Sequence, residues 1–260
     1  MLSAANLVYR VAEATIVDGI SAEFEPGRLH LIMGPNGAGK STLVKLLSRL
    51  LRVTNGQILY GTEEISRFKD RELARRRAIL SQAVEVAFSM PVDELVLMGR
   101  YPHFRGRPAP TDAKICEEVM EFFGIADMAE RSYGTLSGGE KQRVQFARVL
   151  AQIWRPLPDS ARYLFLDEPL TFLDIRHQLD CMRKVQEFAS QMDVVAIGVV
   201  HDLGLAAKFA DRVILLHKGR VIADGPANSV LTVTNLNTAF GVTPTLLTNP
   251  ADGRVHFTFD

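Results

Sequence analysis

The chain has few cysteines and no long hydrophobic run. Its two cysteines, Cys116 and Cys181, follow no metal or redox spacing, so we expect unpaired thiols in a reducing compartment. The longest apolar stretches, such as Val194 to Val200, are far too short to cross a bilayer. Residues Met1 to Asn6 lack the basic region and apolar core of a signal peptide. If this protein works at a membrane, we expect it to do so from the side and through a partner.

The chain also lacks an excess of charge of either sign. Lysine plus arginine and aspartate plus glutamate each number 30. This balance gives no electrostatic footprint for nucleic acid, although it does not exclude a local basic patch. A length of 260 residues is enough for one large domain or two small ones with a full core.

A glycine-rich stretch after a short apolar run carries the strongest signal. It reads Gly34-x-x-x-x-Gly39-Lys40-Ser41 and matches the P-loop template in its context of strand, loop and helix. Its glycines let the backbone curl around an anion, and the positive end of the following helix dipole adds to the field. Lys40 would reach the β- and γ-phosphates, and the Ser41 hydroxyl would ligate Mg²⁺. The residues predicted to bind ATP are Gly34, Pro35, Asn36, Gly37, Ala38, Gly39, Lys40, Ser41 and Thr42.

Two further apolar strands end in groups that could act on a bound nucleotide. The run 162–167 leads directly into Asp167 and Glu168, and adjacent carboxylates there are costly unless a cation or a water needs them. Successive residues of an extended chain point in opposite directions, so we assign Asp167 to the metal shell and Glu168 to general base. The run 194–200 ends at His201, predicted to sense or orient the γ-phosphate. Because ligands of doubly wound sheets bind at the carboxyl ends of strands, all these groups should converge on one pocket.

A second glycine-rich stretch opens another strong helical pattern. Leu136-Ser137-Gly138-Gly139-Glu140 precedes a pattern from Val144 to Gln152, so it offers a helix N-terminus to an anion. It lacks the lysine that would make it self-sufficient. We interpret it as half a phosphate site that something else must complete.

The order of the predicted elements indicates an α/β protein. Prolines punctuate short helices over residues 88–144, so we expect a helical subdomain there, inserted between core segments 1–87 and 145–260 of a single domain, 1–260. The remaining predicted elements are strands at 6–11, 20–25, 29–33 and 57–60, helices at 41–50 and 71–77, and a hairpin at 212–225.

Three features of the chain remain open. Tyr9 is the only early aromatic residue that could stack on an adenine, but it reads equally well as a half-buried strand residue. The basic helix 71–77 fits a solvated face or a contact surface, and the loop 99–107 is basic and aromatic.

The motifs, in this order, resemble the ATP-binding subunits of ABC transporters. The resemblance covers nearly the whole chain, and P-loop kinases and GTPases do not carry the Leu-Ser-Gly-Gly-Glu signature. It implies an α/β P-loop NTPase (RecA-like) core with an antiparallel β layer and an inserted helical subdomain. The residues that carry it are Gly34 to Thr42, Gln82, Leu136 to Glu140, Leu164 to Glu168, Leu173-Asp174 and His201.

The resemblance also implies an activity, an oligomeric assembly and a cellular location. It implies an ATPase with ATP and Mg²⁺ as cofactors, in which two copies pack head to tail. Each ATP would lie between the P-loop of one copy and Ser137-Gly138-Gly139 of the other. Gln82 would ligate and sense Mg²⁺ and, with Asp174, relay the nucleotide state. A membrane permease would dock its coupling helix at the helical subdomain, which places the chain peripherally on the cytoplasmic face of the inner membrane. A periplasmic binding protein would be an indirect partner, and nucleic acid would not be one.

Within this family, some segments depart from the usual pattern and others point to a branch. Phe172 stands where the family usually has a small residue, and the adenine-stacking aromatic, counted back from the P-loop, falls nearer Val11 than Tyr9. The segments 98–103 and 173–178 resemble importers of haem, ferric siderophores and cobalamin. The insert 152–159 resembles the haem branch, so haem is the predicted cargo, with ferric siderophore or cobalamin as the alternative.

Two other functional classes remain as alternatives. A soluble ABC ATPase that acts on nucleic acid or a ribosome usually carries long coiled-coil insertions or two cassettes, and this chain has neither. A regulatory module that holds ATP without turnover would not need Glu168 and His201.

Overall fold

A computed structural model describes residues 1–81, 89–157, 160–170, 173–248 and 255–258. The strands are β1 (Leu2–Val11), β2 (Ala14–Phe24), β3 (Leu29–Met33), β4 (Asn55–Tyr60), β5 (Glu63–Glu64), β6 (Arg77–Leu80), β7 (Arg162–Asp167), β8 (Val194–Val199), β9 (Arg212–His217), β10 (Arg220–Gly225), β11 (Thr245–Thr248) and β12 (Val255–Thr258). The helices are α1 (Lys40–Leu47), α2 (Asp70–Arg76), α3 (Val92–Leu97), α4 (Pro110–Phe123), α5 (Gly138–Ile153), α6 (Ile175–Met192), α7 (Leu203–Phe209), α8 (Ala227–Val230) and α9 (Val233–Phe240). No helix in these ranges is both long and apolar enough to span a bilayer.

A mostly parallel sheet forms the centre of the molecule. Its strand order is β10-β9-β3-β8-β7-β6, and only the edge strand β10 runs antiparallel to its neighbour. The predicted hairpin 212–225 is confirmed. Its turn residues Lys218 and Gly219 have φ of 47° and 79°, the positive values that a two-residue hairpin turn requires.

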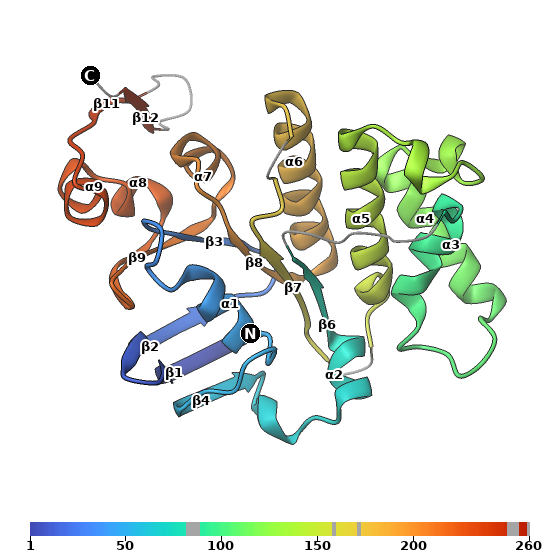
Figure 1. The fold of residues 1–260 in the computed structure, drawn as a ribbon, viewed down its shortest axis with the longest axis horizontal. Helices are drawn as coiled ribbons and strands as arrows, with labels where there is room; N and C mark the ends of the chain where they lie inside the picture. The colour runs from blue at the N-terminus through green and yellow to red at the C-terminus, as the bar shows by residue number, and fades with distance from the viewer. Residues whose placement is uncertain (82–88, 158–159, 171–172, 249–254, 259–260) are drawn as a thin grey trace.

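A smaller antiparallel sheet packs beside the central sheet, in the order β2-β1-β4-β5 (Figure 1, lower left). β1 begins at Leu2 rather than at the predicted Asn6. Asn6 has a φ of 50°, and the pairing with β2 shifts register between Ala4 and Leu7. This bulge breaks the alternation of apolar and polar residues that predicts a strand, so the first half of β1 could not be seen from periodicity.

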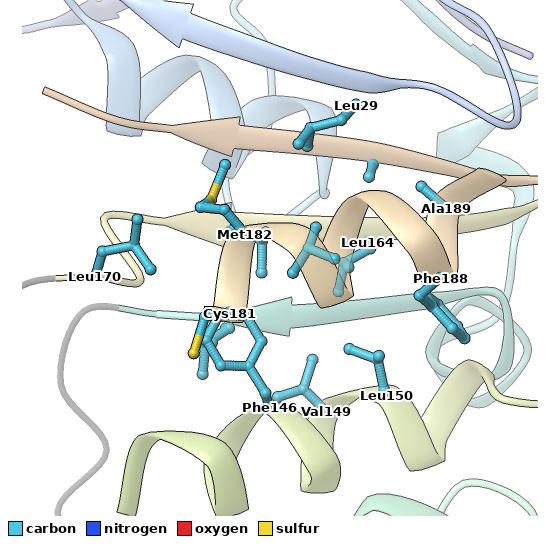
Figure 2. Close-up of a cluster of buried hydrophobic side chains, with 14 of the residues drawn as sticks. Leu29, Phe146, Val149, Leu150, Leu164, Leu170, Cys181, Met182, Phe188 and Ala189 are labelled. Carbon is cyan, nitrogen blue, oxygen red and sulfur yellow. The ribbon is translucent and has the colours of Figure 1, made fainter. Parts of the chain in front are cut away.

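Both faces of the parallel sheet are buried, which explains its continuous apolar strands. In β7, Tyr163 and Phe165 belong to a core shared with α1 and the antiparallel sheet, whereas Leu164 and Leu166 face a second core with α5 and α6. Figure 2 shows the second core, where Leu164 lies between side chains of α5 and α6. Its Cys181 thiol is free, and burial raises its pKa to about 12. α1 and α5 therefore cover opposite faces of the same sheet.

Helices α3, α4 and α5 pack together at one side of the sheet (Figure 1, right). A buried ion pair joins them, because Arg100 Nε lies 3.0 Å from Asp112 Oδ1 and Arg100 Nη1 donates to Ala151 O at 2.7 Å. The predicted boundary at residue 144 falls inside α5, which packs both on the other two helices and on β6. The division of the chain at 88 and 144 therefore stays a prediction.

Trp154 fixes the segment that follows α5 against α6 and α4. Trp154 stacks on Phe188 of α6 with ring centroids 5.3 Å apart, and its Nε1 donates to Glu118 Oε2 at 2.9 Å. Residues 158–159 of the predicted insert lie outside the described residues.

Candidate active site

Three neighbouring strands bring the predicted nucleotide-binding groups to one edge of the sheet. β8 lies between β3 and β7, with Ile32 and Asp167 both in register with Val199. All three strands are parallel, so their carboxyl ends lead together into the P-loop, the Asp167–Glu168 pair and His201.

The P-loop wraps a hollow of about 260 Å³. Gly34 has a φ of 144°, and a Cβ there would lie 2.2 Å from Leu216 O; Gly39 has a φ of 97°, and a Cβ would lie 2.7 Å from Ile16 O. Only glycine fits both positions, because the loop backbone passes directly against its neighbours. The lining residues are Ile16, Asn36, Gly37, Gly39, Lys40, Ser41, Thr42 and Glu168, and Gly34, Pro35 and Ala38 complete the loop behind them.

Lys40 is held by the loop that precedes it. Its Nζ donates to Gly34 O at 2.8 Å and to Pro35 O at 3.0 Å, and the residue is only 5% exposed. Burial lowers the pKa of its ammonium, while the nearby carboxylates of Glu168 and Asp167 act in the opposite direction. A concentrated positive charge therefore sits where the loop can present it to an anion.

The two carboxylates after β7 have different surroundings. Asp167 is 7% exposed, and its Oδ1 is buried with no hydrogen-bond partner among the described residues. Glu168 has a φ of 52°, so the chain reverses there, and its Oε1 accepts a hydrogen bond of 2.8 Å from His201 Nε2. One carboxylate thus faces inward without a donor, and the other is paired with the histidine at the rim of the hollow.

The donor set fits a magnesium ion that is shared with phosphate. An unsatisfied buried carboxylate oxygen is costly, and a cation bound to Asp167 would remove that cost. Within the ranges described, no three His, Cys, Asp or Glu side chains cluster as a metal site. Mg²⁺ usually takes one or two protein ligands and completes its shell with phosphates and water, and Asp167 and Ser41 are the residues that would supply them here. Gln82 lies outside the described residues.

The signature segment caps α5 and does not line the P-loop hollow. Ser137 Oγ accepts from Glu140 N at 3.3 Å, and Ser137 N donates to Glu140 Oε2 at 2.7 Å, a reciprocal capping box. These hydrogen bonds lower the pKa of Glu140. Leu136 is buried, whereas Ser137 and Gly138 are exposed at the helix N-terminus. α5 and α1 cover opposite faces of the sheet, and no residue of the signature segment lines the P-loop hollow of its own chain.

The structure also joins the first turns of α5 and α6, a link that the motifs did not reveal. Asp174 caps α6 and accepts from both the backbone N of His177, at 2.9 Å, and its Nδ1, at 2.8 Å. These bonds lower the pKa of Asp174. The His177 ring lies so close to Gly139 that a Cβ there would be 2.7 Å from it, and Gln142 Nε2 donates to Pro169 O. An N-cap aspartate followed by a histidine three residues later was the available sequence signal.

Tyr9 is half-buried against the core beneath the antiparallel sheet and does not line the hollow. The apolar residue that does line it is Ile16 of β2, which no motif singles out. A stacking role for Tyr9 stays a prediction, and Phe172 lies outside the described residues.

A model of the ABC transporter family matches residues 17–171 of this chain. The chain belongs to the ABC transporter family. It is 44% identical to a hemin import ATP-binding protein of Gloeobacter violaceus, over 97% of this chain and 92% of that protein. It is 40% identical to the hemin import ATP-binding protein of Escherichia coli O157:H7, over 97% and 96% of the two chains.

The solved structures agree on the fold. A metal-chelate type ABC transporter solved in an inward-facing conformation is superposed with a TM-score of 0.83 at 23% identity, covering 100% of this chain and 96% of that one. The predicted α/β P-loop fold is therefore confirmed. This member of the ABC family is a nucleotide-binding ATPase.

Proposed function

We propose that this ABC ATPase powers the import of haem through a partner membrane permease. The observation that supports haem as the cargo is the similarity, over nearly the whole chain, to two proteins named for hemin import. The residues around the P-loop hollow support the energetic part, because Lys40 lines it together with Glu168, which is paired with His201.

Phosphate binding follows from the P-loop and its lysine. Residues Gly34 to Thr42 would hold the ATP phosphates with backbone N–H groups and with the N-terminus of α1. The phosphate oxygens would replace the carbonyls of Gly34 and Pro35 as acceptors for Lys40. Because these carbonyls hold the ammonium at the loop before ATP arrives, little side-chain ordering is required on binding.

Hydrolysis requires a base for the attacking water. Glu168 would accept the proton of that water, and His201, already hydrogen-bonded to it, would fix the carboxylate and contact the γ-phosphate. Asp167 and Ser41, together with Gln82, would hold Mg²⁺, which offsets the charge on the phosphates when it is bound.

The second half of each site would come from another copy of the chain. Ser137, Gly138 and Gly139 lie at the N-terminus of a 16-residue helix and line no part of the P-loop hollow of the same chain. A head-to-tail dimer would place this N-terminus against the γ-phosphate bound by the partner. The link from Pro169 through Gln142 to α5 would let each chain's catalytic segment affect the site of its partner.

The permease would contact the helical subdomain, which we place at residues 88–144 between the core segments 1–87 and 145–260. Gln82 and Asp174 would relay the nucleotide state. The ATPase would work peripherally at the cytoplasmic face of the inner membrane, and a periplasmic binding protein would act on it only through the permease.

Reconstitution tests both parts of the proposal. The ATPase and its cognate permease would be placed in liposomes with the binding protein, and ATP turnover compared with haem, a ferric siderophore and cobalamin. Stimulation by haem alone supports the cargo. Stimulation only by one of the other two would overturn the cargo but leave the ATPase intact, and an absence of basal turnover would overturn the hydrolytic assignment.

A further inference from the structure

Two basic segments that are well separated in sequence meet at the surface. Arg71 of α2 donates through Nε to Pro102 O and through Nη2 to Phe104 O, both at 2.9 Å. Arg75, one turn later, donates to Pro102 O at 2.8 Å and to His103 O at 3.3 Å. The basic helix and the basic, aromatic loop thus lie side by side. We call their five cationic side chains the arginine patch, which consists of Lys69, Arg71, Arg75, Arg76 and Arg105.

Hydrogen bonds join the segments that carry the arginine patch. His103 Nε2 donates to Gln152 O at 2.7 Å, and Gln152 Nε2 donates to Ala74 O at 2.6 Å and Arg77 O at 2.8 Å. The loop, α2 and the end of α5 are therefore tied together. Burial and the nearby Arg100 lower the pKa of His103 to about 4, so the ring is neutral near pH 7. The charge of the patch comes from its arginines and its lysine alone.

This charge is concentrated and mostly uncompensated. The patch surrounds a hollow of about 680 Å³ whose lining contains five cationic side chains and one acidic one, Glu72. Glu72 lies 2.9 Å from Arg76, which leaves four cations. In the part of the chain that the structure describes, no carboxylate forms an ion pair with Lys69, Arg71, Arg75 or Arg105. Arg71 and Arg75 each use two of their five N–H groups on the loop carbonyls, so both retain donors for an anion.

The patch lies away from the nucleotide site. Arg76 immediately precedes β6, and the hollow is also lined by Leu157 and Ser160, just before β7. These are the amino ends of strands whose carboxyl ends lead toward the hydrolytic groups (Figure 1, where α2 lies at the foot of β6). A dimer formed at the carboxyl edge would leave the patch uncovered.

An aromatic pair with one exposed member, Tyr101, adjoins the patch. Tyr101 is 57% exposed and packs edge to face against Phe104, with ring centroids 5.6 Å apart. An exposed tyrosine beside several arginines is the combination found where proteins meet the headgroup region of a membrane. Guanidinium groups suit phosphate because their planar N–H groups can bind two of its oxygens at once.

We propose that the arginine patch binds the phosphate groups of anionic phospholipids. A lipid headgroup surface offers a phosphate to the guanidinium groups and an apolar boundary to the exposed Tyr101, and an acidic peptide is one outcome of the test. This inference rests on the proposed work at a membrane. Tyr101 and Arg105 lie within residues 88–144, where we propose that the permease docks, so the lipid contact would border the permease. Its test requires neither cargo nor ATP.

The experiment measures binding of the full chain to sedimented vesicles of phosphatidylcholine, with and without phosphatidylglycerol. The wild-type protein should bind the anionic vesicles and be released by added salt. The variant Lys69→Glu/Arg105→Glu removes two cations that form none of the loop hydrogen bonds described above. Each cation near an anionic surface changes partitioning about fivefold, so binding should fall by at least about 25-fold. The control Arg183→Glu/Lys208→Glu makes the same charge change on α6 and α7 and should bind within about threefold of wild type.

Three results would overturn the inference. Equal loss in both double variants would show only a general charge effect. Full competition by inorganic phosphate at low concentration would assign the patch to a free anion, and binding to a polyglutamate peptide but not to vesicles would assign it to an acidic protein. ATP turnover of Lys69→Glu/Arg105→Glu in solution should equal that of wild type, so a failure of the hydrolytic assignment would be visible separately.

Discussion

Replacing Glu168 with glutamine would remove a base while keeping its shape. In the structure Glu168 Oε1 accepts a hydrogen bond of 2.8 Å from His201 Nε2, and the amide oxygen of glutamine can accept the same bond. The amide cannot take a proton from water. General-base assistance is worth about 10²- to 10⁴-fold, or roughly 3 to 5 kcal/mol of barrier, and we expect turnover to fall by that factor.

The assay separates turnover from binding. Phosphate release gives the rate, and titration with a fluorescent ATP analogue gives the affinity, which should stay within about threefold of wild type because Glu168→Gln leaves the phosphate cradle unchanged. Lys40→Ala should show the opposite pattern. It removes the ammonium that faces the phosphates, so affinity should fall at least tenfold, since a hydrogen bond to a charged group is worth about 1.5 to 3 kcal/mol.

The backbone at this position supplies a control for folding. Glu168 has a φ of 52°, a conformation that costs a residue with a Cβ about 1 to 2 kcal/mol and glycine much less. Glu168→Gly should therefore lose turnover as glutamine does, while its thermal unfolding midpoint stays equal to or above that of wild type. Native turnover in Glu168→Gln would refute the assignment of the base, and a large drop in stability of Glu168→Gly would refute the account of the backbone.

Three further predictions follow from other parts of the chain. In a Glu168→Gln background, ATP should convert the ATPase to a dimer in light scattering, and Ser137→Arg should abolish that shift by clashing with the partner's nucleotide; dimerisation of the double variant would remove the signature from the interface. Asp112→Asn should lower the free energy of unfolding, measured by urea titration, by about 3 to 5 kcal/mol because Arg100 would stay buried without its counter-charge. The control Asp180→Asn removes the exposed pair with Arg183 and should lower it by less than about 1 kcal/mol. The pKa of His103 is about 4 in the folded chain and 6.5 in the unfolded chain, so the unfolded chain binds more protons between these pH values and stability falls as the pH drops through them. His103→Gln should reduce that fall by roughly 1 to 2 kcal/mol, allowing for partial exposure of the ring. An unchanged dependence of stability on pH would contradict this prediction.

The glycine-rich loop and the strand ends could be recognised from the sequence because their chemistry is local. Gly34, Gly37 and Gly39 have positive φ values and precede a helix, and both features are visible in consecutive residues. The hairpin 212–225 was equally accessible, since Lys218-Gly219 forms a two-residue turn between two short apolar runs. The meeting of the three strand ends at one edge could be predicted for the same reason, because ligands of doubly wound sheets bind at the carboxyl ends of the strands.

Element boundaries were less accessible where a single residue left the regular conformation. The helix predicted over 41–50 ends at Leu47, because Arg49 has a φ of 56° and the N–H groups of Leu50 and Leu51 both turn back to Lys45 O. The spacing of apolar residues in the sequence does not indicate such a reversal of the chain. The cargo is a different case, since no transported molecule touches this subunit and only the similarity to hemin import proteins indicates it.

Several features of the chain were decided by tertiary structure alone. Arg100 and Arg105 stand in the same basic loop, yet Arg100 is buried against Asp112 and Arg105 is exposed on the arginine patch. His177 packs on Gly139 only because α5 and α6 lie against one face of the same sheet. Each outcome depends on which distant segments the sheet brings together. A local sequence pattern records the conformation a residue prefers, but the partner that it meets is set by long-range packing.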